Sequence, residues 1–194
     1  MKGMERIVRR LNLGARNERR FAFVPQTGES FTDRVSNAFA AEKGAGGEEL
    51  LMIGADAPLI KPETVDAAFD FVYARSGMAL GPTGEGGAYL IGFPADAPVR
   101  LDTAFDEGAE LLNLTAEARR LALPLKLLPL TLDVDVEADL VSLVALLGGL
   151  EYQRSFETQT VPMNTLRVAG DLGLSIQRSG DESRAKKIVA AQPA

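Results

Sequence analysis

The chain has 194 residues, of which 46% are hydrophobic and 25% charged, and its formal net charge is −6 at pH 7. This length suits one domain with an appended tail, and no apolar stretch approaches the roughly 20 residues that a membrane-spanning helix requires. Cysteine and histidine are both absent, which excludes disulfides, thiolate nucleophiles and histidine-based triads, and leaves an inventory suited to phosphate and nucleotide chemistry with a hard cation.

The first twenty residues are basic. Seven Lys or Arg residues face two glutamates there, so residues 1–20 carry about +5 and the remainder about −11. Such a stretch could hold phosphates or nucleic acid. We favour a solvated helix face, because Ile7, Val8 and Leu11 recur at helical spacing, and we expect no nucleic-acid partner. The segment also lacks the apolar region of a signal peptide, which favours a cytoplasmic protein.

The rest of the sequence alternates strands and helices. We expect strands at residues 21–24, 50–53, 78–80, 88–92 and 125–128, and helices at residues 31–42, 62–77, 107–121 and 136–147. Strands separated by helices predict an α/β domain over residues 1–150 with a largely parallel sheet. For residues 151–194 we expect an extension that packs on this domain, with a helix at 165–173, a strand at 174–177 and a mobile, charged stretch at 180–187.

Asp56 follows the apolar run at residues 50–53 and precedes Pro58. A short continuous apolar run is typical of a strand buried on both faces, and Pro58 prevents that strand from continuing. In open α/β sheets, ligands bind at the carboxyl ends of the strands. A lone Asp before a turn is, however, more often a cap or an Asx-turn. Both interpretations remain open from these residues alone.

Residues 81–87, with the sequence GPTGEGG, contain four glycines. Glycine lets the backbone approach a ligand closely, and the amides of such a loop can contact phosphate or sugar oxygens. The segment is neither a Walker loop nor a dinucleotide fingerprint, since GxxxxGK[ST] is absent and a strand follows the glycines. It is therefore either a ligand-binding loop or a wide connection between neighbouring strands.

Asp133 and Asp135 alternate with Leu132 and Val134. An extended backbone would point both carboxylates to one side, where they would attract a cation. Oxygen ligands without Cys or His favour Mg²⁺ or Mn²⁺. The alternative is that Asp135 caps the helix expected to begin near Val136, with Asp139 as a solvated residue of its first turn.

In this order, the three motifs resemble those of the GT-A-type nucleotidyl and glycosyl transferases. The strongest resemblance is to the DUF2064 family, also called radical-SAM/selenodomain-associated transferase 1, whose pattern runs roughly GSDxPxL, GPxxDGGYYLIG and DVDTxxDL. This chain has GADAPL at 54–59, GPTGEGGAYLIG at 81–92 and LDVDVEADL at 132–140. Residues 26–34, QTGESFTDR, are similar to the family's Q-G-x-x-D-L-G-x-R segment. The resemblance covers residues 21–147 and implies a three-layer α/β/α fold with a mainly parallel, Rossmann-like sheet.

The resemblance also implies a function. The protein would be a glycosyl or nucleotidyl transferase that uses Mg²⁺ or Mn²⁺, a nucleotide or nucleotide-sugar, and a small-molecule acceptor. Asp56, Asp133 and Asp135 would be the catalytic carboxylates and metal ligands. Arg34 would contact phosphate, and the remaining ligand-binding positions would be Glu85, Gly86 and Gly87. Glu85 stands where the family has Asp, so its charge is kept but displaced by one methylene.

One departure from the family is large. The family begins with an apolar strand and a basic glycine loop similar to xxKxPxPGxxKTRL, which cradles the phosphates, and residues 1–20 show neither. Without that strand, the strand that ends before Asp56 lacks a neighbour. Three explanations compete: an N-terminally truncated enzyme; a sheet completed by another subunit or by residues 21–24; or a non-catalytic binding or assembly protein on the same scaffold. A homodimer would form through the exposed sheet edge or the C-terminal extension.

Overall fold

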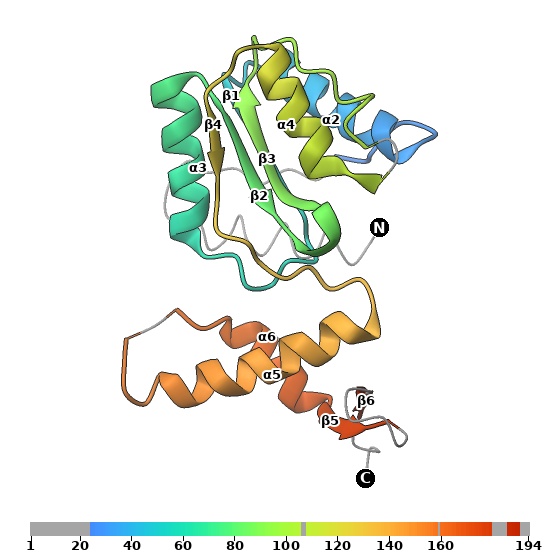
Figure 1. Cartoon of the computed structure of the whole chain (residues 1–194), viewed down its shortest axis with the longest axis vertical. Helices are drawn as coiled ribbons and strands as arrows, with labels where there is room; N and C mark the ends of the chain where they lie inside the picture. The colour runs from blue at the N-terminus through green and yellow to red at the C-terminus, as the bar shows by residue number, and fades with distance from the viewer. Residues whose placement is uncertain (1–23, 106–107, 159, 180–185, 191–194) are drawn as a thin grey trace.

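The computed structural model describes residues 24–105, 108–158, 160–179 and 186–190 (Figure 1). The elements in chain order are α2 (Phe31–Gly44), β1 (Glu49–Ile53), α3 (Pro62–Arg75), β2 (Met78–Pro82), the 3-10 turn η1 (Gly84–Gly86), β3 (Ala88–Pro94), α4 (Glu110–Arg120), β4 (Leu125–Leu127), α5 (Glu137–Gln153), α6 (Met163–Asp171), β5 (Ser175–Arg178) and β6 (Lys186–Val189). The basic segment at 1–20 lies outside the described residues, as does the strand expected at 21–24 except for Val24, which is exposed and irregular.

Four strands form one mixed sheet in the order β1-β3-β2-β4. β4 is parallel to β2, whereas β3 lies antiparallel to both β1 and β2. Three strands therefore run in one direction, and β3 is inserted between two of them in the opposite one. The reason is local: a short glycine-rich turn joins β2 to β3, and a short connection produces an antiparallel pair, while a parallel pair needs a longer crossover.

Helices cover both faces of this sheet. On one face, α2 and α4 pack on alternate strand residues. The largest residues of this core are Phe39 and Leu114 from the helices and Met78, Leu80, Ile91 and Phe93 from the strands. On the other face, α3 packs Ala68 and Val72 against Ala79 and Leu90. Figure 1 shows α3 on one side of the strands and α2 with α4 on the other. The predicted three-layer α/β/α architecture is confirmed.

β1 is less buried than its sequence indicates. Leu50 is 6% exposed, but Ile53 at the end of the same apolar run is 41% exposed. The prediction that this strand is buried on both faces is wrong for Ile53. β1 forms an edge of the described sheet: β3 pairs with one side of it, and no strand in the described ranges pairs with the other.

Local sequence signals set the starts of the first two helices. Ser30 and Asp33 form a capping box at the start of α2, in which each side chain accepts a 3.0 Å hydrogen bond from the other residue's backbone N–H. These bonds to Ser30 lower the pKa of Asp33. Pro62 occupies the first turn of α3, where its missing N–H costs nothing. The start of α2 matters for the site, because it sets the position of Phe31.

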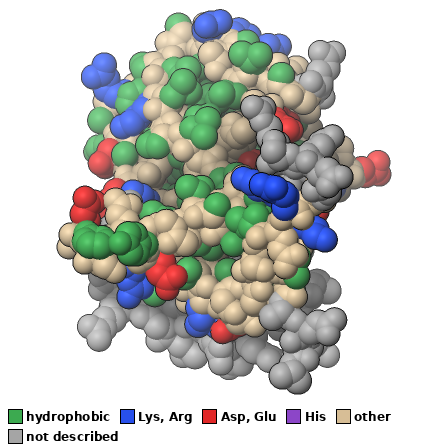
Figure 2. Space-filling view, turned by 60° about the horizontal axis from the view of Figure 1, so that its bottom comes forward, with side chains coloured by type: hydrophobic (Ala, Val, Ile, Leu, Met, Phe, Trp, Pro, Cys, Tyr) green, Lys and Arg blue, Asp and Glu red, His purple; other side chains and the backbone are tan. Residues whose placement is uncertain are grey.

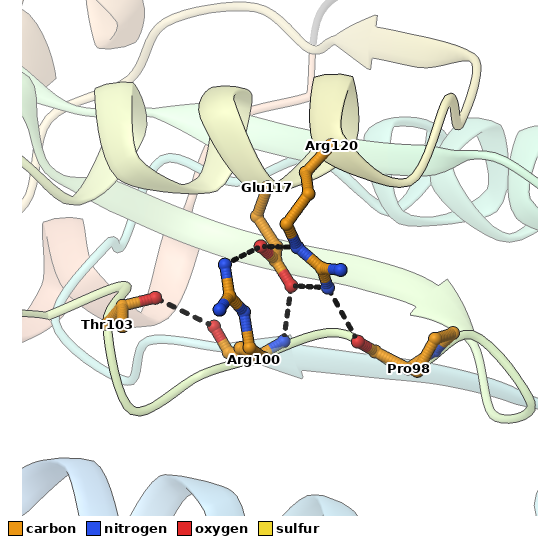
Figure 3. A network of polar contacts seen from close by, with 5 residues as sticks. All are labelled: Pro98, Arg100, Thr103, Glu117 and Arg120. Atoms are coloured by element: carbon orange, nitrogen blue, oxygen red, sulfur yellow. Dashed lines mark hydrogen bonds and ion pairs between the residues drawn. The ribbon is translucent and has the colours of Figure 1, made fainter.

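A buried carboxylate fastens the loop after β3 to α4 (Figure 3). Glu117 is only 4% exposed, and its Oε1 accepts hydrogen bonds from the Arg100 backbone N at 2.7 Å and from Arg120 Nη2 at 2.6 Å. Arg120 Nε donates to Oε2 at 2.7 Å, and Arg120 Nη2 also donates to the Pro98 carbonyl at 3.1 Å. These contacts, those from Arg120 first, hold the pKa of Glu117 down at about 2.

The C-terminal elements form a separate group beside the α/β part (Figure 1). α5 contacts both strands of the antiparallel hairpin β5–β6, and Glu137 Oε1 accepts a 2.9 Å hydrogen bond from the Ile188 backbone N. The boundary expected after residue 150 falls within α5. Residues 186 and 187, which were expected to be mobile, belong to β6 because they pair with β5.

No helix in the described ranges is both long and apolar enough to cross a membrane. On the face that Figure 2 presents, Lys and Arg side chains are scattered among hydrophobic and acidic ones rather than gathered in one patch.

The Glu117 network predicts a pH-dependent loss of stability. In Glu117→Gln the arginines lose their charged acceptor, and we expect the free energy of unfolding at pH 7 to fall by about 2 kcal/mol, a value that allows for the partial exposure of both arginines. Because the folded pKa is about 2 and the ordinary value 4.5, this stabilisation is complete above pH 4.5 and is lost as the pH falls towards 2. Urea unfolding between pH 7 and 3 should therefore show the two proteins converging.

The exposed Glu151 provides the matched control. We expect Glu151→Gln to unfold like the wild type throughout this range. A Glu117→Gln protein as stable as the wild type at pH 7 would contradict the structural role of this carboxylate.

Candidate active site

Two backbone hydrogen bonds bring the sequence motifs together. The Val134 N–H donates to the Asp56 carbonyl at 3.0 Å, and the Thr131 N–H donates to the Pro82 carbonyl at 3.2 Å. The irregular segment that follows β4 therefore runs along the ends of β1 and β2. It carries Asp133 and Asp135 to the carboxyl edge of these strands, where Asp56 already lies, and this is the edge where open α/β sheets bind ligands.

A cavity of about 460 Å³ opens at this edge. Its described lining joins the glycine-rich connection, the acidic segment and two aromatic rings: Gly84, Glu85, Gly87, Asp133, Asp135, Asp139, Phe31 and Phe105. The prediction that Asp133 and Asp135 face the same side agrees with their shared cavity, although Leu132 also lines it. The described lining includes Glu110 as a further carboxylate but no Lys or Arg.

The connection between β2 and β3 is shaped by its glycines. Gly86 has φ 86° and Glu85 has φ 57°, so the chain turns through left-handed conformations at both positions. At Gly87, a Cβ would come within 2.5 Å of Thr83 Oγ1 and 3.9 Å of Asp133 Oδ2. Glycine thus keeps the space between the loop and Asp133 open. The loop joins neighbouring strands, as one interpretation of the sequence predicted, and it also lines the cavity, although Gly86 is not among the lining residues. That the loop binds a ligand stays a prediction.

Asp135 lies in a strongly negative environment. Its pKa is raised by desolvation and then by the charges of Asp133, Asp56 and Asp139, in that order. Asp139, and not Asp135, caps α5: Asp139 Oδ2 accepts hydrogen bonds from the backbone N–H groups of Asp135 at 3.1 Å and Val136 at 3.0 Å. The capping alternative for Asp135 is therefore wrong, because α5 begins one residue later than that role requires, with Val136 as its N-cap.

Asp56 lies beside the cavity rather than in its described lining. Its Oδ1 is 2.6 Å from the position that a Cβ on Gly54 would take. The carboxylate therefore folds back over the end of β1, and the missing side chain of Gly54 permits this. Asp56 acts on the site in two ways: its charge raises the pKa of Asp135, and its carbonyl holds Val134.

Arg34 is not brought to the cavity. Its Nη1 donates a 3.2 Å hydrogen bond to the Glu29 carbonyl at the start of α2, and a different residue of the same helix, Phe31, lines the cavity. Phe31 and Phe105 pack edge to face with their ring centroids 5.1 Å apart. Sequence reasoning missed both rings. The cap at Ser30 could have indicated where Phe31 lies, because it sets the start of α2. Phe105 follows the loop that the Glu117 network holds, and no local sequence pattern indicated its position.

A divalent cation would have few protein ligands here. Within the described ranges, no three acidic side chains are arranged as a metal-binding group. Magnesium commonly takes only one or two carboxylates and completes its shell with water and substrate phosphates. Asp133 and Asp135 are the carboxylates of the described lining that could contribute to such a shell.

The mutual repulsion of these carboxylates can be measured. In Asp133→Asn, the neutral amide removes one like charge, and we expect the pKa of Asp135 to fall towards its ordinary value of 3.8. An NMR titration of the carboxyl carbons reports this directly. Asp66→Asn, an exposed change on α3, should leave the titration of Asp135 unchanged. If the pKa of Asp135 is the same in the wild type and in Asp133→Asn, the two carboxylates do not form one electrostatic group.

Comparisons with known proteins extend this description. The sequence profile of the family described as "Uncharacterized protein conserved in bacteria (DUF2064)" matches residues 4–107. The crystal structure of a candidate nucleotide-diphospho-sugar transferase from Desulfovibrio desulfuricans G20 is similar, with a TM-score of 0.60 and 25% sequence identity over 75% of this chain. The match spans 62% of that protein's length. No curated protein matches the chain. Since the family profile covers more than half of the 194 residues, the protein belongs to the DUF2064 family.

Proposed function

We propose that this protein is a metal-dependent transferase that acts on a nucleotide or a nucleotide-sugar and transfers a glycosyl or nucleotidyl group to a small-molecule acceptor. Membership of the DUF2064 family and the likeness to the D. desulfuricans protein support a transferase. One observation carries the proposal further. Asp133 and Asp135 share a cavity with the glycine-rich loop, and Asp56 acts electrostatically on the same aspartate.

Mg²⁺ or Mn²⁺ is the cation that this donor set suits. The candidate ligands are carboxylates, Asp133 and Asp135 with Asp56 beside them, and hard oxygen donors favour these ions. The raised pKa of Asp135 reflects in part a repulsion that a bound cation would relieve. When bound, the cation would neutralise charge on the phosphates of the ligand.

The other lining residues provide binding surfaces. Phe31 and Phe105 present an apolar wall against which a base or a sugar ring can pack. Glu85 and Glu110 can accept hydrogen bonds from the hydroxyl groups of a sugar or an acceptor. The open space left by Gly87 allows a ligand to reach Asp133. A cavity of about 460 Å³ lies within the range of small-molecule sites.

The second candidate function is a non-catalytic binding or assembly protein on the same scaffold. It is favoured by one specific observation, namely that the described lining of the cavity holds five carboxylates and no Lys or Arg. A nucleotide phosphate is usually held by positive charge, and no side chain of the described lining supplies it.

Calorimetry tests the nucleotide site on which the transferase proposal depends. We expect the purified protein to bind at least one member of a panel of nucleoside diphosphates, triphosphates and nucleotide-sugars in the presence of Mg²⁺ or Mn²⁺, and to lose this binding on chelation with EDTA. In Asp135→Asn, the affinity should fall at least about tenfold, equivalent to about 1.4 kcal/mol. Asp96→Asn, at the opposite end of the sheet, is the matched control and should bind like the wild type. Absence of binding to every ligand with either cation would favour the non-catalytic alternative.

A further inference from the structure

The longest described helix, α5, carries no charge through its middle. Residues 140–150 have the sequence LVSLVALLGGL, and a helix with apolar residues on all sides is typical of a protein core. In this structure, however, only two residues of α5 are buried, Leu143 and Leu147. The described part of the chain therefore leaves one side of this helix uncovered.

The uncovered side of α5 is a continuous, uncharged surface. Spacings of three and four residues place its members on the side away from Leu143 and Leu147, and the last member follows in the turn after the helix. Every member is exposed. We call this surface the α5 face, and it consists of Ala138, Ser142, Ala145, Gly149, Tyr152 and Phe156.

One end of the α5 face is aromatic. Tyr152 and Phe156 are each 71% exposed, and their rings pack edge to face with centroids 5.2 Å apart. Leu146 flanks the face and is 48% exposed. A group of exposed apolar side chains marks an interaction site, whereas a single one needs no explanation.

The other end of the α5 face consists of small side chains. Ser142 Oγ donates a 3.1 Å hydrogen bond to the Ala138 carbonyl, so this hydroxyl is already satisfied within the helix. In the described part of the chain, a Cβ added to Gly149 would meet no other segment within 4 Å. Glycine weakens the interior of a helix, but here it leaves room for a second helix to approach closely.

The α5 face is complementary to an antiparallel copy of itself. With a two-fold axis at the level of residue 147, Tyr152 of one copy lies over Ser142 of the other. Phe156 lies over Ala138 in the same way, and Ala145 lies opposite Gly149. Each ring then meets a small residue, as knobs meet holes in packed helices. A parallel pair would instead oppose ring to ring and leave a gap between the small ends.

The area available is that of a weak, reversible dimer. An aromatic side chain has roughly 200 Å² of surface, so the four rings of a dimer would remove up to about 570 Å² from water. Stable interfaces begin at about 1,200 Å² in total, and the small end and Leu146 must supply the rest. We therefore expect a dissociation constant on the order of micromolar.

We propose that α5 is a dimerisation helix, whose α5 face packs antiparallel against the α5 face of a second copy of this chain. The interface is isologous, because both copies use the same surface around a two-fold axis. It lies beyond residues 4–107, which the family profile matches, and it does not depend on the transferase function proposed above.

Sedimentation equilibrium of the full chain tests the dimer. Between about 1 and about 200 µM, we expect a reversible equilibrium between monomer and dimer. In Tyr152→Lys, an unpaired charge enters the contact, and the dissociation constant should rise at least about tenfold. Tyr73→Lys is the matched control, because Tyr73 lies on α3 and is 75% exposed. This variant should dimerise like the wild type.

The absence of cysteine permits a separate test of the orientation. Chains with Ala145→Cys are mixed with chains with Gly149→Cys under a mild oxidant. Because the antiparallel pair brings these positions opposite each other, the mixed disulfide should form several-fold faster than either like pair. Faster formation of the like pairs would overturn the antiparallel arrangement.

Other outcomes would reject the dimer. A wild-type protein that stays monomeric at the highest concentration would overturn the proposal, as would a dimer that Tyr152→Lys leaves unchanged. A monomer that binds phosphatidylcholine vesicles through Tyr152 would assign the α5 face to a lipid surface instead. Circular dichroism of each variant should match the wild type, since every substituted residue is exposed.

Discussion

The hydrogen bond from the Val134 amide to the Asp56 carbonyl determines how the candidate site is assembled. β4 ends at Leu127, and the chain that follows has no regular structure until α5. An irregular segment at a sheet edge still has to satisfy its backbone polar groups. The Thr131 and Val134 amides do so by binding the carbonyls of Pro82 and Asp56. The acidic segment consequently lies across the ends of two strands.

Two carboxylates in this protein show opposite consequences of their surroundings. Glu117 is surrounded by donors from Arg100 and Arg120, and its pKa falls to about 2. Desolvation first, and then the charges of neighbouring aspartates, raise the pKa of Asp135. The paired carboxylate stabilises the fold by holding a loop, whereas the carboxylate beside like charges is a candidate for a functional role. The contrast separates a structural carboxylate from a candidate functional one.

The edge of β1 links the fold to the family comparison. The sequence resemblance to the family implies an N-terminal strand and a phosphate loop, and residues 1–20 do not match that pattern. The described sheet ends at β1, and an apolar groove lies beside it. The described lining of the cavity holds no Lys or Arg.

Much of the fold follows from local sequence. The strand at β2, the start of α3 at Pro62 and the cap of α2 were all predictable, since each depends on residues within a few positions of one another. The high solvent exposure of Ile53 was not predictable, because it depends on which strands pair beside β1. Whether Asp135 caps α5 stayed open from the sequence, because Asp135 and Asp139 both lie at the start of the helix. Only the backbone path shows that Asp139 accepts the capping hydrogen bonds.

For the candidate site, too, some features follow from the sequence and others only from the tertiary structure. By itself, the sequence determined that Asp56 follows a strand, that Asp133 and Asp135 alternate with apolar residues, and that a glycine-rich segment joins β2 to β3, because these properties depend only on neighbours along the chain. Only the tertiary structure decided that Asp133 and Asp135 share a cavity with Phe31 and Phe105, and that Arg34 does not. Those positions arise from hydrogen bonds and packing between segments tens of residues apart, and no local pattern encodes such contacts.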